Sequence, residues 1–91
     1  MRRPIDLHRS FVKSYAKRIA KNQKLVAQYE TRVELFVEGV RNAPLNDHPL
    51  AGNLDGKRAF SITADVRVIY IETNDAIVFV DIGTHAQVYD G

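Results

Sequence analysis

The spacing of apolar residues changes once along the sequence, and this change constrains the fold more than any other feature. In the first half, Phe11, Tyr15 and Ile19 recur every four residues, which is the spacing of one helix face. A second apolar set with helical spacing follows, and it ends before a proline that a helix interior cannot accommodate. The pattern predicts a helical hairpin formed by residues 10–21 and 25–42.

The second half of the sequence has the pattern of β-strands. Apolar residues alternate from residue 57 onward, and the nearly continuous apolar run 76–82 is typical of a central strand. The predicted strands are residues 57–64, 66–72 and 76–82, preceded near the N-terminus by a short strand at 4–8. We therefore expect an α+β fold in which the hairpin covers one face of a three-stranded antiparallel sheet and the other face stays open. Residues 1–91 are expected to form a single domain.

Composition excludes several classes of protein. The 91 residues contain no cysteine, which rules out disulfides, thiolate metal sites and a thiol nucleophile. No apolar run approaches the length of a membrane span, and no secretory apolar segment follows the first residues. We expect a cytoplasmic protein.

Charge is distributed very unevenly along the chain. The first 24 residues carry eight Lys or Arg and one acid, a local charge of +7, whereas the remaining 67 carry five basic and ten acidic residues, a charge of −5. Such a basic segment suits a polyanion, because neutralised phosphates release their counterions. A nucleic acid partner is one interpretation, and a solvated helix face is the other.

Asp65 and Arg67 place an acid and a base within an otherwise apolar strand. Two residues apart on a strand, they are expected to share one face, while Val66, Val68 and Tyr70 face the core. The pair is a candidate functional site, although a solvated ion pair on an exposed face is the alternative.

Three histidines are candidates for proton transfer because their pKa lies near neutrality. His8 lies in the predicted first strand without polar neighbours, which favours a structural or surface role. His48 lies in a proline- and glycine-containing loop of residues 43–56, and His85 directly follows the central strand. A metal site combining His48 and His85 with Asp65 is conceivable, but no closely spaced pair of ligands supports it.

Several motifs together resemble one known family. The residues that carry the resemblance are the runs 48–58, 62–70 and 81–85 and the pair Val88-Tyr89. They contain the patterns His-Pro-Leu-x-Gly, Asp-x-Arg-Val-Ile-Tyr and Gly-Thr-His, and they resemble the RelE/ParE toxin superfamily, in particular its YafQ-like branch. The resemblance covers the second half of the chain in motif and the first half in element order.

The resemblance implies the toxin of a type II toxin–antitoxin module with the order β-α-α-β-β-β. Such a toxin is an endoribonuclease that cleaves mRNA in the ribosomal A site and needs no metal or other cofactor. The implied partners are a cognate antitoxin protein, mRNA and the ribosome, with promoter DNA contacted only through the antitoxin and no membrane.

The resemblance also assigns roles to individual residues. His48, Asp65 and His85 fall at catalytic positions of the YafQ-like branch, Tyr89 at the position of a C-terminal aromatic residue, and Arg67 at that of a phosphate-binding arginine. Attack by the 2′-hydroxyl needs a base, a cation and an acid, and the candidates are His48 or Asp65, then Arg67, then His85. Tyr89 could stack on a base or orient the phosphate.

The chain departs from the branch at Ala59 and Ser61, where YafQ-like toxins have an acid and a second histidine. RNA contacts are predicted for basic residues outside the catalytic set. These are Lys13, Lys17, Arg18, Lys21, Lys57 and Arg58.

Two other classes remain open from the sequence. A ParE-like toxin would share the fold and inhibit DNA gyrase without cutting RNA, but it would have no need for His48 and His85. A basic binding module without activity is the third possibility, and a tolerated His85→Ala substitution in a growth assay would indicate it.

Overall fold

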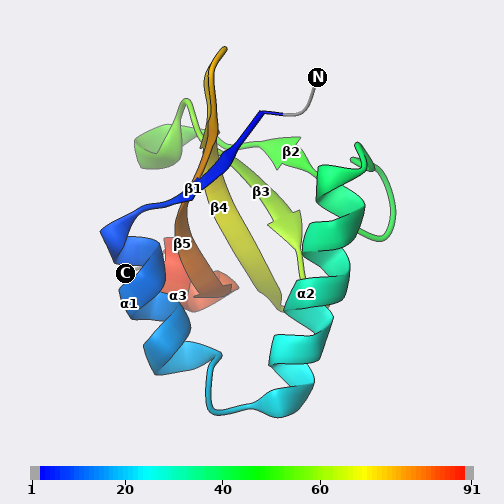
Figure 1. Cartoon of the computed structure of the whole chain (residues 1–91). Helices are drawn as coiled ribbons and strands as arrows, with labels where there is room; N and C mark the ends of the chain where they lie inside the picture. Colours follow the sequence, from blue (N-terminus) through cyan, green and yellow to red (C-terminus); the bar gives the residue numbers. More distant parts are fainter. Residues whose placement is uncertain (1–2, 90–91) are drawn as a thin grey trace.

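The computed structural model describes residues 3–89, in which a five-stranded sheet carries two long helices on one face (Figure 1). The strand order across the sheet is β1-β5-β4-β3-β2. The strands are β1 (Ile5–Leu7), β2 (His48–Pro49), β3 (Arg58–Ser61), β4 (Val66–Glu72) and β5 (Ile77–Thr84). The helices are α1 (Arg9–Arg18), α2 (Gln23–Val37) and α3 (His85–Tyr89), with a short 3-10 turn, η1, at Gly52–Leu54. The expected α+β fold is confirmed.

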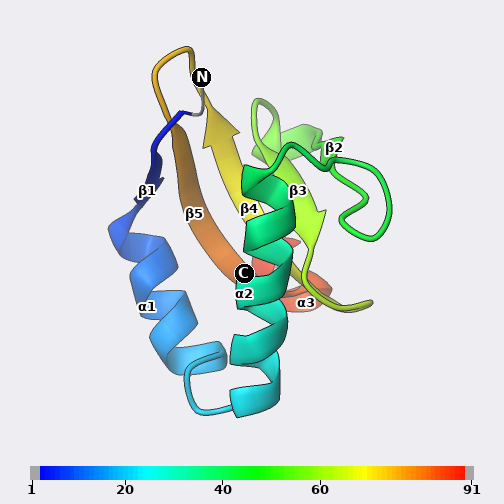
Figure 2. The same cartoon turned by 45° about the vertical axis from the view of Figure 1, so that its right-hand side comes forward.

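The sheet is larger than the predicted three-stranded meander. The meander β3-β4-β5 is present and antiparallel, and β5 continues beyond the expected end at residue 82. The first strand joins the sheet as a parallel partner of β5, which Figure 2 shows alongside it. The two-residue strand β2 extends the opposite edge from within the predicted loop. The short strand predicted at residues 4–8 is thus present as β1, but its pairing with β5 was not predicted. Strand β2 was missed because two residues are too short to show a period.

Both helices of the hairpin are shorter than predicted. A histidine caps the start of α1, where the ring Nδ1 of His8 accepts a hydrogen bond from the backbone N–H of Ser10 at 3.1 Å. Helix α2 ends near Gly39, whose φ of +103° is the left-handed conformation that glycine adopts readily. The backbone N–H groups of Gly39 and Val40 donate back to the carbonyls of Phe36 and Leu35, which closes the last turn. The helix therefore stops at Val37, well before the proline.

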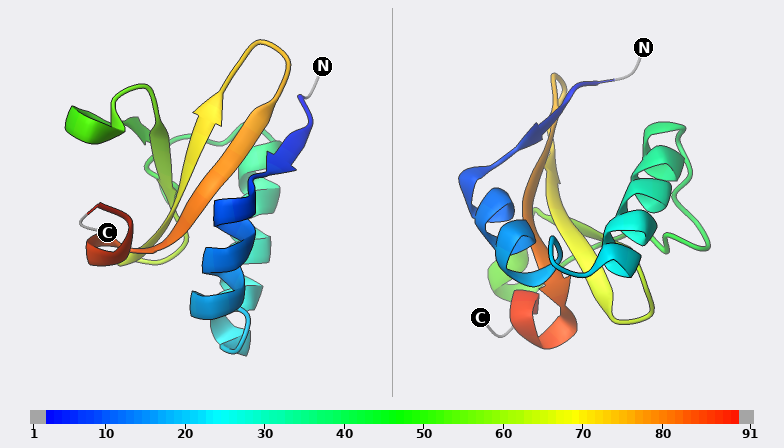
Figure 3. Two further views of the ribbon diagram at one scale, coloured as in Figure 1. Left: turned by 90° about the vertical axis from the view of Figure 1, so that its left-hand side faces the viewer. Right: turned by 60° about the horizontal axis from the view of Figure 1, so that its bottom comes forward.

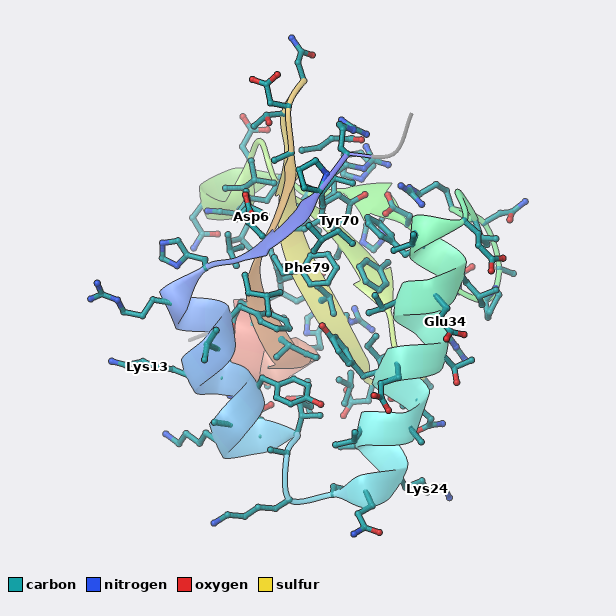
Figure 4. All side chains as sticks on the ribbon, in the orientation of Figure 1. Asp6, Lys13, Lys24, Glu34, Tyr70 and Phe79 are labelled. Atoms are coloured by element: carbon teal, nitrogen blue, oxygen red, sulfur yellow. The ribbon has the colours of Figure 1, made fainter. Side chains whose placement is uncertain are left out.

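The main core lies between the sheet and the two helices and is built from aromatic rings. Phe36 of α2 stacks on Phe60 of β3 with ring centroids 4.5 Å apart, and both contact Tyr70 and Phe79. Tyr70 and Phe79 point from the sheet toward the helices in Figure 4. The predicted inward set of β4, Val66, Val68 and Tyr70, is buried in this core. Opposite-face residues of β4 must then point away from the helices.

The second face of the sheet is not fully open as expected. Helix α3 packs there, and Val88 forms a second cluster with Ala59 and Ile69. Figure 3 shows α3 and the segment around η1 on the side of the sheet opposite α1 and α2. No helix within residues 3–89 has the length and apolar content needed to cross a membrane.

Side chains of α1 protect the edge of β5 that β1 leaves uncovered. Ser10 donates to the carbonyl of Val80 at 2.5 Å, Ser14 donates to the Asp81 carboxylate at 2.6 Å, and Arg18 donates to the carbonyl of Ile82 at 3.0 Å. An unpaired strand edge would otherwise offer its backbone groups to other chains. The polar side of α1 thus has a structural role along β5.

Candidate functional site

Helix α3 begins directly where β5 ends, and a reciprocal pair of hydrogen bonds fixes that junction. The backbone N–H of Gln87 donates to the Thr84 hydroxyl at 3.3 Å, and the backbone N–H of Thr84 donates to the Gln87 side-chain oxygen at 2.8 Å. This is the capping box of a Thr-x-x-Gln sequence. These two hydrogen bonds fix the orientation of the first turn of α3, which carries His85.

His85 and Tyr89 lie one turn apart on α3, and their rings contact each other. The ring centroids are 4.4 Å apart and the planes meet at 61°, an edge-to-face arrangement. The His85 side chain is exposed, whereas the Tyr89 side chain is half-buried and packs beside the second cluster. The pair therefore presents an accessible imidazole over a fixed aromatic ring.

Arg67 of β4 reaches the same place from the sheet. Its guanidinium carbon lies 5.8 Å from the centroid of the Tyr89 ring, and its Nη2 donates to the carbonyl of Ala64 at 3.3 Å. The Nε of Arg67 and the hydroxyl of Tyr89 are both buried, and neither has a hydrogen-bond partner within the described residues. Unsatisfied buried polar atoms cost about 1–3 kcal/mol each. Both side chains therefore keep unused hydrogen-bonding capacity within residues 3–89.

The neighbours of Arg67 across the sheet are small. Ser61 lies opposite it on β3 and Gly83 lies opposite it on β5. A Cβ atom added at Gly83 would lie 2.7 Å from the Gln87 side-chain oxygen and 2.8 Å from Nη1 of Arg18. Gly83 therefore allows the capping box and the α1 side chain to approach the end of β5 together.

The sheet register places His48 on the face that carries α3. His48 pairs with Ala59, and Ala59 pairs with Ile69, so the three side chains point to one side of the sheet. Two strand spacings and two residues along the strand put the Cα atoms of His48 and Arg67 about 12 Å apart. The His48 ring is exposed, with Nδ1 2.9 Å from the carbonyl oxygen of Asn46.

Asp47, a residue that the sequence did not single out, anchors the segment before His48. Its side chain is fully buried, forms an ion pair with Nη2 of Arg58 at 2.7 Å, and accepts a hydrogen bond from the Tyr70 hydroxyl. Burial is the main reason that the pKa of Tyr70 is raised, and the bond to Asp47 adds to the effect. Arg58, predicted to contact RNA, is thus engaged with Asp47.

Asp65 does not lie where the sequence placed it. Strand β4 begins at Val66, and Asp65 lies exposed in the bend before it. The Thr63 hydroxyl accepts hydrogen bonds from the backbone N–H groups of Asp65 and Val66, and this turn ends the strand pairing early. Within the described residues, no ion pair joins Asp65 to Arg67. The expectation of a charged pair on one strand face was wrong.

The predicted RNA-binding residues are divided between two environments. Lys13, Lys17 and Lys21 are exposed, and Lys13 points away from the sheet in Figure 4. Arg18 is half-buried and pairs with Asp81 at 3.3 Å. Lys57 lines a hollow on the second face of the sheet together with residues of α1, β4 and β5.

The alternative of a metal site finds no support in the geometry. Residues 3–89 contain no group of three or more His, Asp or Glu side chains placed to hold a metal ion. His48, His85 and Asp65 do not form such a group.

We expect the capping box to control the order of α3. Gln87→Ala removes the acceptor for the Thr84 N–H, and because a cap contributes about 1 kcal/mol, exchange of that amide should be roughly fivefold faster. Gln87→Glu keeps the acceptor and should keep the protection. Hydrogen exchange followed by nuclear magnetic resonance measures both, and equal protection in Gln87→Ala would show that the box does not hold the helix.

Comparison with known proteins places this chain in a family. A sequence profile described as "Bacterial toxin of type II toxin-antitoxin system, YafQ" matches residues 3–90. The crystal structure of YafQ from Escherichia coli strain BL21(DE3) has 25% sequence identity and a TM-score of 0.80, covering 96% of this chain and 98% of that chain. A chain of the E. coli DinJ–YafQ toxin–antitoxin complex has 25% identity and a TM-score of 0.79, covering 98% and 99%.

A more distant structure shares the fold alone. The YoeB dimer from Staphylococcus aureus has 17% identity and a TM-score of 0.71, covering 93% of this chain and 99% of that chain. Comparison with curated protein sequences finds no match. The profile match spans nearly the whole sequence, so the class is that of bacterial toxins of type II toxin–antitoxin systems. Within that class, the chain belongs to the YafQ family.

Proposed function

We propose that this YafQ-family toxin is an endoribonuclease that cleaves mRNA on the ribosome through attack by the substrate's own 2′-hydroxyl, without a metal or other cofactor. The observation that carries the proposal is the cluster of Arg67, Tyr89 and His85, in which a cation, a hydroxyl and an exposed imidazole from two elements meet. Within residues 3–89, two of its buried polar atoms lack partners. A phosphate bound at the open side of the half-buried Arg67 guanidinium would accept hydrogen bonds from it.

Arg67 is the proposed cation for the charge that develops on the phosphate. A guanidinium offers a planar set of donors that matches phosphate oxygens, and its charge is permanent. Because the neighbouring Tyr89 ring restricts the side chain, the donors are positioned before the substrate binds. Tyr89 is proposed to orient the phosphate or to stack on an adjacent base through the face of its ring.

His85 is the proposed general acid for the departing 5′-oxygen, and His48 or Asp65 is the proposed general base. His85 is exposed at the first residue of α3, so its imidazole can reach a bound nucleotide. His48 shares the sheet face of Arg67 through the strand register, whereas Asp65 is close to Arg67 in sequence. Comparing His48→Ala with Asp65→Asn identifies the base, because only its removal lowers the rate by orders of magnitude.

This site has fewer proton-transfer groups than the resemblance to YafQ-like toxins implies, because Ala59 and Ser61 replace an acid and a histidine. Ala59 is fully buried between β2 and β4 within the second cluster, and Ser61 lies beside Arg67. A carboxylate and an imidazole at these two places would each border the proposed phosphate site. The chain is therefore proposed to rely on His85 and a single base.

The proposed partners follow from family and charge. An antitoxin is proposed because the similar E. coli YafQ is found in a complex with DinJ. The exposed Lys13, Lys17 and Lys21 of α1 are proposed to contact ribosomal RNA, whose phosphates attract them. Promoter DNA would be reached only through the antitoxin, and the cytoplasm is the proposed compartment.

Primer extension on a translated message tests the proposal. Purified toxin, freed from its antitoxin, is added to translating ribosomes with and without a chelator at a level that spares the ribosome. We expect new message ends in both conditions and none on naked message. Intact message together with inhibited DNA gyrase would instead identify a toxin of the ParE type, and cleavage lost only with chelator would overturn the metal-independent mechanism.

A further inference from the structure

The segment directly before His48 has an unusual backbone conformation. Asn46 has a φ of +49°, in the left-handed region that residues other than glycine rarely adopt and that asparagine tolerates best. Its carbonyl oxygen lies 2.9 Å from Nδ1 of His48. A carbonyl oxygen can only accept a hydrogen bond, so Nδ1 is the donor and carries a proton. A neutral His48 ring then has its free lone pair on Nε2.

The side chain of Asp47 anchors this segment from the other face of the sheet. Its fully buried carboxylate accepts hydrogen bonds from the Tyr70 hydroxyl and from Nε of Arg58, the latter at 2.8 Å. Tyr70 belongs to the main core between the sheet and the helices, whereas His48 lies on the face that carries α3. Successive side chains of an extended chain point to opposite faces, so fixing Asp47 on one face fixes His48 on the other.

Strand β2 depends on such an anchor because its own pairing is very short. It pairs with β3 through two residues, and one of them is Pro49, which has no N–H to donate. A slip of one residue would turn the His48 side chain to the wrong face. The same slip would separate the buried Asp47 carboxylate from its donors, which is strongly unfavourable for a charged group. The carboxylate therefore selects the register in which His48 faces the proposed site.

We propose that Asp47 is a positioning residue for His48, an inference that rests on the proposed function with His48 as its base. Asp47 fixes the segment in which the Asn46 carbonyl keeps a proton on Nδ1, so Nε2 of His48 is free to take the proton of the 2′-hydroxyl. The oxygen of that hydroxyl bonds to phosphorus while the bond from phosphorus to the 5′-oxygen breaks, and His85 protonates the departing oxygen. Asp47 is buried and acts only through His48.

Single-turnover cleavage of a translated message tests this inference in Asp47→Ala and Asp47→Asn, each with His48 present and with His48→Ala. With His48 present, we expect Asp47→Ala to lower the rate roughly 10- to 100-fold, as for a reacting group displaced by about 1 Å. In the His48→Ala background the further loss should be less than about twofold, because the group that Asp47 positions is gone. Asp47→Asn can keep a hydrogen bond to each partner and should lose less. Cosedimentation should show unchanged ribosome affinity.

Asp81→Asn is the matched control for Asp47→Asn. Asp81 also pairs with an arginine, Arg18 at 3.3 Å, but it does so at the edge of β5. We expect this control to cleave at the wild-type rate. Tyr70→Phe tests the same network if Asp47→Ala does not fold, because it removes one donor to Asp47 and keeps the ring in the core. Its loss of rate should again require His48, and circular dichroism shows that each variant folds.

Nuclear magnetic resonance of the isotope-labelled toxin without ribosomes reports the tautomer of the neutral His48 ring. We expect the proton on Nδ1 in the wild type and a mixture of both tautomers in Asp47→Ala. A wild-type ring with its proton on Nε2, or an equal loss of rate from Asp47→Ala with and without His48, would overturn this inference alone. Undiminished cleavage by His48→Ala would do the same and leave Asp65 as the base. A wild type that cuts no message would overturn the proposed function and this inference with it.

Discussion

His85→Ala is expected to slow cleavage of a translated message by roughly 10²–10⁴-fold, the usual contribution of a positioned general acid. The imidazole is exposed and its ring contacts that of Tyr89, so the substitution should leave folding and ribosome binding unchanged. Primer extension under single-turnover conditions measures the rate, and cosedimentation with ribosomes measures binding.

His8→Asn is a matched control for that experiment. His8 is also exposed, but it lies at the start of α1 and caps the helix through its ring nitrogen, a role that asparagine can replace. We expect this variant to cleave at the wild-type rate. Undiminished cleavage by His85→Ala, or an equal loss in both variants, would remove His85 from the mechanism.

Substitution of Arg67 is expected to lower the cleavage rate without lowering the free energy of unfolding. Arg67→Met keeps the length of the side chain and removes the buried Nε, which has no partner within residues 3–89. We therefore expect a loss of roughly 10²–10³-fold in cleavage, as for other donors to a developing charge, with a free energy of unfolding equal to or above that of wild type. A structural arginine would show the reverse, with stability falling by about 1–3 kcal/mol.

Arg67→Lys completes this test. A lysine keeps the charge but presents a single point of contact, so it should restore only part of the lost rate if the planar guanidinium matters. Arg9→Lys, at an exposed position of α1, is the control and should leave cleavage unchanged. Full activity of Arg67→Lys would reduce the role of Arg67 to a general positive charge, and full activity of Arg67→Met would contradict the proposed phosphate site.

The sequence alone determined the fold class and the main core. Residues spaced for one helix face and residues alternating along strands must be buried together, and this requirement located α1, α2 and the strands β3, β4 and β5. The predicted end of α2 was wrong by five residues, because Gly39 closes the helix before the proline. The same requirement assigned the inward side of β4 correctly. These features depend on local patterns that are several residues long, which is why they can be recognised without contacts.

Only the tertiary structure decided the features that depend on contacts between distant residues. Helix α3 and the strand β2 are too short to show a period, and they form because β5 and β3 offer them a surface. The burial of Asp47 depends on Arg58 and Tyr70, eleven and twenty-three residues further along the chain.

In the candidate site too, the sequence identified individual residues, and the tertiary structure decided which of them lie together. The motifs identified His85, Arg67 and Tyr89 as separate residues, but their convergence depends on the turn from β5 into α3 and on the row that joins Arg67 to Gly83. The predicted pairing of Asp65 with Arg67 failed because a turn held by the Thr63 hydroxyl keeps Asp65 outside β4, which begins at Val66. Likewise, periodicity could not show that Val12 stays exposed, since that depends on how α1 rotates to place its serines and Arg18 on the free edge of β5.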